Sequence, residues 1–82
     1  MAVTNACIRR HILALCAARG PAKTCCPSEV ARRLAPDWRS LMPRVRAQAA
    51  QLAESGQIVI TQRGSPVAMD AVSGPIRLGL HK

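Results

Sequence analysis

Residues 27–56 read PSEVARRLAPDWRSLMPRVRAQAAQLAESG and contain two helical patterns with a short bend between them. The first pattern begins at Ser28, a residue type that suits the N-cap. Glu29 follows with a carboxylate in the first turn, where the helix dipole favours negative charge. Pro36 ends this helix, because a proline ring clashes with the preceding turn and lacks an N–H. The sequence therefore predicts a short helix that stops at a bend.

The second pattern predicts a longer helix over about 40–55. Its apolar positions recur at helical spacing and form one buried stripe, made of Leu41, Val45, Ala49 and Leu52. Pro43 is tolerable only in the first turn, where its missing N–H has no intrahelical partner. Gly56 suits the left-handed cap that follows the last turn. A short helix, a tight bend and a longer helix give the order of a helix-turn-helix.

A further helix precedes this pair, from Cys7 to the end of the apolar stretch at 12–18. Its apolar stripe recurs at i, i+4 and i+7, at Ile8, Ile12 and Leu15. Thr4 or Asn5 can cap its start. The Gly-Pro pair at 20–21 ends it, since glycine suits the position after the last turn and proline cannot continue a helix.

After the longer helix the apolar period changes from helical spacing to two. Residues 57–61 and 75–80 alternate in the way that half-buried strands do. Residues 62–74 between them predict a long hairpin loop rather than a tight turn. The fold class is therefore α+β, a winged helix of three helices followed by a two-stranded β wing, in a single domain over 1–82. The expected core comprises Ile8, Ile12, Leu15, Val30, Leu34, Leu41, Val45, Leu52, Ile58, Ile60, Ile76 and Leu78.

A set of short segments in this order resembles a known protein family. The segments are PSEVAR (27–32), WR (38–39), LMP (41–43), VR (45–46), TQRG (61–64) and GPIRL (74–78). They resemble a family of small bacterial proteins that is known as a domain of unknown function with a winged-helix-like fold. The resemblance runs from about Ile8 to Leu80. It implies this fold and a bacterial, cytoplasmic protein, and it transfers no functional residues.

The charge of the chain points to a polyanionic partner. In 82 residues, 12 Lys and Arg oppose 4 Asp and Glu, which gives a net charge of +8. So basic a small domain attracts polyanions through its local potential and through counterion release. Trp38 is the only aromatic residue of the Phe, Trp and Tyr class. This excludes a platform of stacked aromatics as the main way of binding single strands or RNA.

No segment is long enough to cross a membrane. The longest apolar run, 12–18, falls far short of the ~20 residues that a spanning helix needs. Arg9 and Arg10 ahead of this run resemble the start of a signal peptide, but cleavage there would remove a helix that the fold needs. We therefore expect a cytoplasmic protein with no membrane partner.

Seven arginines are candidate DNA-binding residues: Arg32, Arg33, Arg39, Arg44, Arg46, Arg63 and Arg77. Arg39, Arg44 and Arg46 would enter the major groove, because an arginine fork fits both phosphate and guanine. Phosphate contact without sequence reading, or a solvated or protein-facing surface, stays open for this helix. Arg32 and Arg33 would hold phosphate, Arg63 would position the wing at 62–75, and Arg77 lies on its returning strand. The sequence thus favours a domain that binds duplex DNA, possibly a small transcription regulator.

An alternative of another class stays open at this point. Residues 67–72 of the wing tip are apolar apart from Asp70, and the 40–55 helix presents several alanines. Such surfaces suit a protein-protein interaction module that forms a homodimer or docks on a larger subunit. Trp38 has two readings as well: it anchors the packing of the bend, or it stacks on a base or partner.

The four cysteines do not have the spacing of a zinc site. There is no C-x-x-C motif, and Cys25 and Cys26 are adjacent. Cys7 and His11 share one side of a helix, and Cys25 or Cys26 could approach them, but we expect reduced thiols without metal and no cofactor. The scattered acids and two histidines offer no catalytic set, so we do not expect an enzyme.

Overall fold

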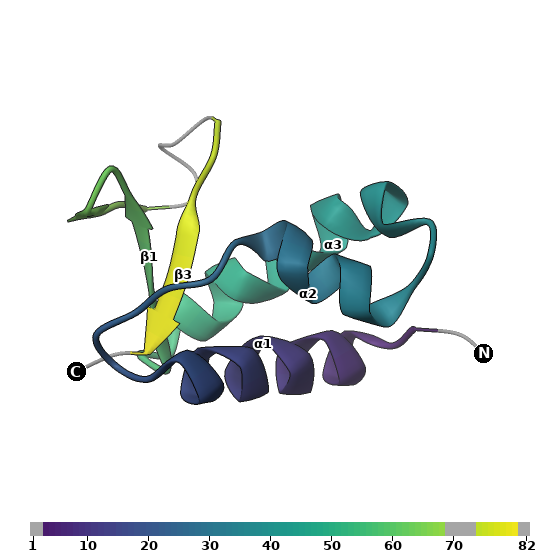
Figure 1. The fold of residues 1–82 in the computed structure, drawn as a ribbon, viewed down its shortest axis with the longest axis horizontal. Helices are drawn as coiled ribbons and strands as arrows, with labels where there is room; N and C mark the ends of the chain where they lie inside the picture. Colours follow the sequence, from purple (N-terminus) through teal and green to yellow (C-terminus); the bar gives the residue numbers. More distant parts are fainter. Residues whose placement is uncertain (1–2, 69–73, 81–82) are drawn as a thin grey trace.

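The computed structural model describes residues 3–68 and 74–80 and places three helices ahead of a small antiparallel sheet (Figure 1). The elements are α1 (Asn5–Arg19), α2 (Pro27–Leu34), α3 (Trp38–Glu54), β1 (Ile58–Gln62), β2 (Ser65–Pro66) and β3 (Arg77–Leu80). This α+β arrangement confirms the predicted element order, and it is consistent with a winged-helix-like fold. The name wing is used below for β1, β2 and β3.

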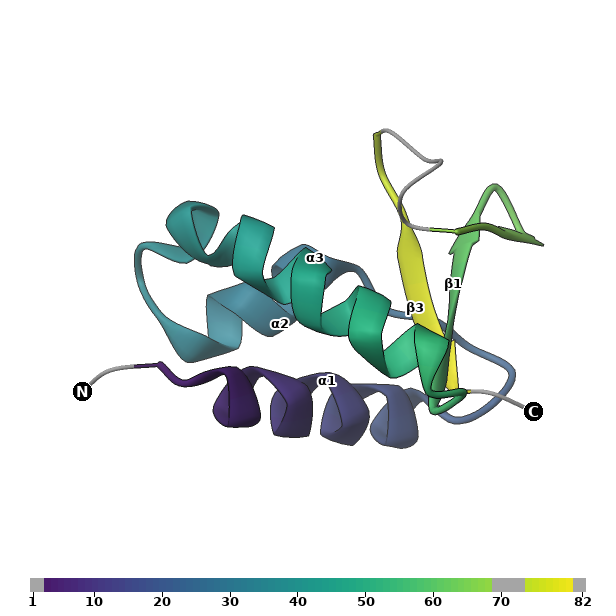
Figure 2. The same cartoon turned by 180° about the vertical axis from the view of Figure 1, so that it is seen from behind.

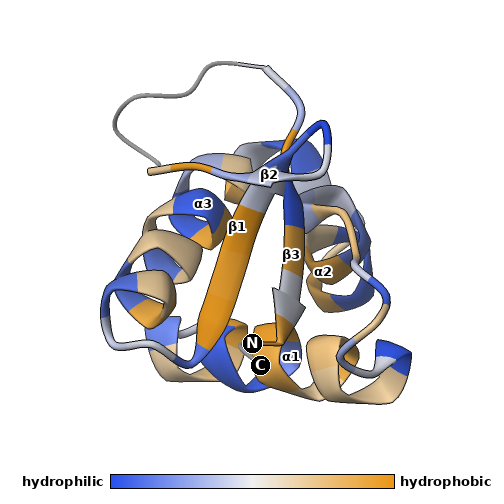
Figure 3. Cartoon of the chain, turned by 90° about the vertical axis from the view of Figure 1, so that its left-hand side faces the viewer, coloured by the Kyte–Doolittle hydropathy of each residue, from blue (hydrophilic) through white to orange (hydrophobic). Residues whose placement is uncertain are grey.

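The three helices form the body of the domain and the wing rises from one end of it. In the front and back views, α1 lies along one side, and α2 and α3 pack over it (Figures 1 and 2). Figure 3 shows β1 and β3 side by side in front of the helices. Ile58 and Ile60 of β1 and Leu78 of β3 are buried, so one face of the sheet packs against the helices.

Both helices of the helix-turn-helix begin earlier than the sequence indicated. Cys26, and not Ser28, is the N-cap of α2, and Pro27 occupies the first helical position, where its fixed φ suits the helix. Glu29 lies in the first turn as predicted, and its Oε1 accepts the backbone N–H of Cys26 at 3.1 Å. The Ser28 hydroxyl lies 3.1 Å from the sulfur of Cys26 instead of capping the helix.

The early start of α3 places Pro43 inside the helix. α3 begins at Trp38, because Ser40 turns back and donates to the carbonyl oxygen of Asp37 at 2.9 Å and to its carboxylate at 2.8 Å. Pro43 is then the sixth helical residue and not a first-turn residue, which corrects the expectation from sequence. Its ring leaves the carbonyl of Arg39 without the hydrogen bond that a residue four positions later normally donates.

The wing has three strands and a tight turn where a two-stranded wing with a long loop was expected. Gln62 pairs with Ser65, so only Arg63 and Gly64 connect β1 to β2. Both residues have positive φ, 53° and 83°, as a two-residue type I′ hairpin turn requires. The strand order is β2-β1-β3. The predicted loop at 62–74 therefore begins with a turn that Gly64 makes accessible.

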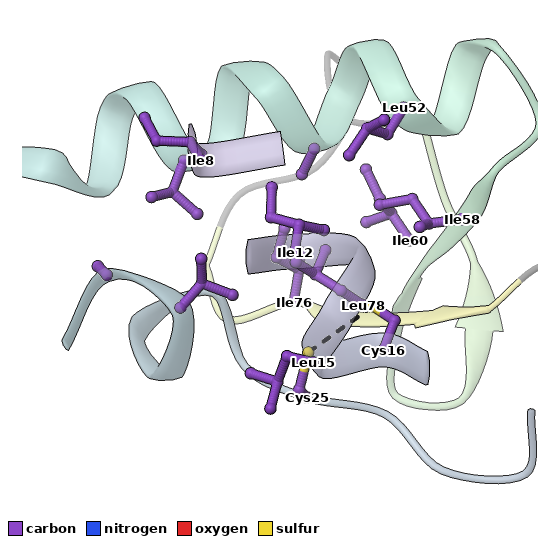
Figure 4. Packing of buried hydrophobic residues seen from close by; sticks show 14 of the residues in the cluster. Ile8, Ile12, Leu15, Cys16, Cys25, Leu52, Ile58, Ile60, Ile76 and Leu78 are labelled. Atoms are coloured by element: carbon purple, nitrogen blue, oxygen red, sulfur yellow. Dashed lines mark hydrogen bonds between the residues drawn. The ribbon is translucent and has the colours of Figure 1, made fainter. Parts of the chain in front are cut away.

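The core is aliphatic and lies between the helices and the sheet (Figure 4). All of the predicted core residues are buried except Leu34, which is half-buried because α2 ends there at the surface. Cys16, Cys25 and Ala31 are buried in the same cluster, although apolar spacing did not single them out. Cys25 also pairs with Leu78 in an isolated antiparallel bridge, which ties the segment before α2 to the edge of β3.

Candidate nucleic-acid interface

Arg39 and Arg46 lie on one face of α3, because seven residues make nearly two turns of an α-helix. Arg39 is exposed and Arg46 is half-buried. Both terminal nitrogens of Arg46 lie 3.5 Å from the carbonyl oxygen of Gly74, a residue of the segment that leads into β3. This contact joins the middle of α3 to the segment before β3.

Arg44 is directed to another part of the molecule. Its guanidinium donates to the carbonyl oxygen of Val3 at 2.6 Å and to the side chain of Asn5 at 3.0 Å. These contacts hold the chain as it enters α1, on the opposite side of α3 from Arg46. The structure therefore does not bring Arg44 together with the other candidate groove residues of α3.

Arg63 and Arg77 meet at the wing. With Gln62 and Pro75 they line a cavity of about 330 Å³. Arg77 is also tied to the segment before α2, since it donates to the Thr24 hydroxyl at 3.0 Å and to the Thr24 carbonyl oxygen at 3.1 Å. Both arginines are exposed. The structure thus groups the two wing arginines that the sequence singled out.

Arg32, Trp38 and Arg39 form a cluster across the bend between α2 and α3. The guanidinium carbons of Arg32 and Arg39 lie 4.6 Å and 4.5 Å from the centre of the Trp38 ring. Trp38 is half-buried and packs against the core, which confirms that it anchors this bend. Both arginines are candidates from the sequence, but their shared contact with one indole has no local sequence signal, because Arg32 lies on the other side of the bend. Arg33 is exposed beside this cluster.

Two elements that carry candidate arginines lie on the side of the domain away from α1. In both views of Figures 1 and 2, the first turns of α3 and the β1–β2 turn lie opposite α1. Arg39 belongs to the first of these elements and Arg63 to the second. This side therefore presents arginine at two separated places.

The candidate arginines form no ion pairs with the acidic side chains of the described residues. Within residues 3–68 and 74–80, the one ion pair joins Arg19 to Glu29, away from α3. The Cys26 backbone N–H and then Arg19 stabilise the carboxylate of Glu29 and lower its pKa. None of the seven candidate arginines forms an ion pair within the described residues, although the charge of Arg77 also acts on Glu29 and lowers its pKa. The surface that carries them is therefore rich in positive charge.

The cysteines do not gather around His11. The sulfur of Cys7 lies 3.7 Å from Nδ1 of His11, but Cys25 packs beside Cys16, and Cys26 lies against Ser28. Neither Cys25 nor Cys26 therefore approaches Cys7 and His11, as the sequence had allowed. In the part of the chain that the structure describes, no group of three or more His, Cys, Asp or Glu side chains is placed to hold a metal ion.

The apolar wing tip is described only at its beginning. Val67 packs against the core, and its N–H donates to the carbonyl oxygen of Ile60 at 2.9 Å. This part of the 67–72 segment is therefore turned toward the protein itself. Residues 69–72, on which the protein-docking alternative also depends, lie outside the described residues.

Comparisons with known proteins give a family and no function. None of the described helices is both long and apolar enough to cross a membrane. A search of curated proteins returned no match. A family model with the description "Protein of unknown function (DUF3253)" matches residues 5–81, which is nearly the whole chain, and the chain therefore belongs to this family.

Proposed function

We propose that this domain binds duplex DNA through α3 and the wing. The observation that carries the proposal is the set of arginines on α2, α3 and the wing that form no ion pair within the described residues. A protein surface of this kind binds the phosphate backbone and releases its counterions. Such a role places the protein in the cytoplasm, with DNA as its partner.

In this proposal α3 lies in the major groove. Arg39 and Arg46 are seven residues apart and therefore about 10 Å apart along the helix axis, so that Arg39 meets the backbone at the edge of the groove while Arg46 enters it. The major groove is about 12 Å wide and accepts an α-helix, and an arginine fork can bind the O6 and N7 atoms of guanine. The contact of Arg46 with Gly74 keeps the wing beside α3, so that both can reach one duplex.

The remaining arginines contact the sugar-phosphate backbone. Arg32 and Arg33 extend from the last turn of α2, which crosses the backbone in helix-turn-helix proteins. Arg63 and Arg77 bring two positive charges to one cavity of the wing, where a phosphate group fits. Arg44 is exposed but is held toward the start of α1 by Val3 and Asn5, so it contributes to this interface only from its edge.

The test is the anisotropy of a labelled random-sequence duplex of about 20 base pairs, titrated with protein at several salt concentrations. With ~4–6 phosphates neutralised, log K should fall with log[salt] at a slope of roughly −4 to −5. Arg46→Ala should weaken binding by about 1–2 kcal/mol. Arg10→Ala removes the same charge from the exposed face of α1 and should change binding by less than about twofold. A flat salt response, or equal effects of the two variants, would contradict the proposal.

A further inference from the structure

The cluster of Arg32, Trp38 and Arg39 holds two positive charges close together on an exposed surface. Each guanidinium carbon lies about 4.5 Å from the same ring centre, so the two are separated by no more than twice that distance. The arginine side chains belong to exposed residues, whereas Trp38 is half-buried against the core. The indole is thus a fixed support for two otherwise flexible side chains.

The contact of each arginine with the indole is attractive, whereas the two arginines repel each other. The electron-rich face of an indole attracts a guanidinium group. The two like charges repel each other, and none of the described carboxylates forms an ion pair with either one. Asp37, the acid next in sequence to Trp38, accepts a hydrogen bond from Ser40 and forms no ion pair with either arginine. The cluster therefore has no anion in direct contact with its two guanidinium groups among the described residues.

We propose that the Arg32–Trp38–Arg39 cluster is a clamp for a backbone phosphate of duplex DNA, with Trp38 as the positioning residue. This inference rests on the proposed function and names the contact that anchors the helix-turn-helix to the backbone. A guanidinium fork binds phosphate oxygens in a bidentate manner, and a DNA strand carries one charge per 3.4 Å of its axis. Two arginines held on one ring can therefore bind one phosphate together or two successive ones.

The role of Trp38 in this clamp differs from base stacking. A ring face that a guanidinium group covers is closed to a nucleotide base. Holding the arginines in place before binding removes part of the entropy cost of ordering their long side chains. Trp38 therefore increases affinity without touching DNA, and the clamp is indifferent to base sequence.

Trp38 also provides the readout, since it is the sole tryptophan of a chain that has no tyrosine. Its emission in the unmodified protein should change when duplex DNA is added, with the same midpoint as the anisotropy of the labelled duplex. Inorganic phosphate, added at equal ionic strength in place of DNA, should change the emission far less at micromolar concentration, because it lacks the neighbouring contacts. A phosphate effect as strong as that of the duplex would overturn the assignment to DNA.

Variants distinguish binding by the clamp from binding by positive charge alone. Arg32→Ala and Arg39→Ala should each weaken duplex binding roughly fivefold to tenfold, and the charge-matched Arg10→Ala by less than twofold. Arg32→Lys keeps the charge but loses the planar fork, and should still weaken binding by about threefold. Circular dichroism and urea midpoints check that each variant is folded.

The outcomes distinguish the clamp from DNA binding in general. If the duplex binds but Trp38 emission stays constant at saturation, or if Arg32→Ala weakens binding no more than Arg10→Ala, the clamp is wrong and DNA binding stands. If the labelled duplex shows no anisotropy change at low salt, both proposals are overturned. Binding of Arg32→Lys at the affinity of the unmodified protein would also overturn the clamp.

Discussion

The sulfur atom of Cys16 lies 3.9 Å from that of Cys25, and both side chains are fully buried (Figure 4). Cys16 belongs to the last turns of α1. Cys25 exchanges two backbone hydrogen bonds with Leu78 of β3, at 2.8 Å and 2.7 Å. The thiol pair therefore sits where the first helix, the segment before α2 and the sheet meet, and its protonation state is coupled to the integrity of the core.

We expect the protein to lose stability at alkaline pH because of this pair. The hydrogen bond with Cys16, and after it burial, raise the pKa of Cys25 above its ordinary value of 9.0. The hydrogen bond lowers the pKa of Cys16, so below about pH 9 this thiol opposes the effect of Cys25 on stability. Above about pH 9 the unfolded chain has lost both protons while folded Cys25 keeps its own, so the free energy of unfolding falls as pH rises. Urea denaturation between pH 7 and pH 10 measures this slope.

A double variant provides the control for the thiol pair. Cys16→Ala with Cys25→Ala should be less stable at pH 7 by about 2–3 kcal/mol, because two buried side chains are shortened. Its stability should depend less on pH between 8 and 10, since the two buried groups no longer titrate. A slope equal to that of the unmodified protein would assign the alkaline effect to other groups.

Glu29 should make the protein sensitive to acid. The Cys26 N–H, and after it Arg19, lower the pKa of Glu29 below 4.5, so the folded state favours the carboxylate. This stabilisation is complete above the unfolded pKa and is lost as pH falls through the folded pKa. Glu29→Gln should lower stability at pH 7 by about 0.5–1 kcal/mol and flatten the decline below pH 5, as thermal melts would show. An unchanged acid profile in this variant would contradict the assignment.

Pro43 should be a weak point of α3. Replacing it by alanine restores an N–H that can donate to the carbonyl of Arg39 and removes the ring from the helix interior. Pro43→Ala should therefore raise the free energy of unfolding by about 1–2 kcal/mol. Pro75, which is exposed and lies outside the helices, offers a control, and Pro75→Ala should change stability by less than about 0.5 kcal/mol. A loss of stability in Pro43→Ala would show that the ring packs favourably.

Most of the fold could be predicted from apolar spacing, because burial of one face imposes a period that the residues display. Ile8 and Ile12 on α1, and Ile58 and Ile60 on β1, are buried for this reason. Helix ends depend on single hydrogen bonds, and here prediction was less accurate. Ser28 and Cys26 could each precede the first turn of α2, and the preference of proline for the first helical position is the signal that would have favoured Cys26.

The candidate site could be predicted only in part. Helical spacing predicts that Arg44 and Arg46, two residues apart, face opposite ways, but not that Arg44 would bind the start of α1. The stacking of Arg32 on Trp38 depends on the angle between α2 and α3, which no local pattern encodes. The tight turn at Arg63 was missed because type I′ turns usually carry Asn, Asp or Gly at the first position.

We expect Arg63 to lower the stability of the fold and to contribute to DNA binding. Its φ of 53° places an arginine in the left-handed region, at the first position of the β1–β2 turn. Asparagine tolerates this region better, and Asn-Gly is a preferred pair for a type I′ turn. Arg63→Asn should therefore raise the free energy of unfolding by about 0.5–1 kcal/mol. The same change removes one positive charge from the wing cavity, so the salt slope of duplex binding should decrease in magnitude by about 1.

Arg63→Lys keeps the charge and the strained backbone, and should leave both stability and slope nearly unchanged. Urea denaturation and anisotropy on these two variants give both quantities. A gain of stability in Arg63→Asn without loss of DNA affinity would remove Arg63 from the interface and leave its conformation without a functional explanation.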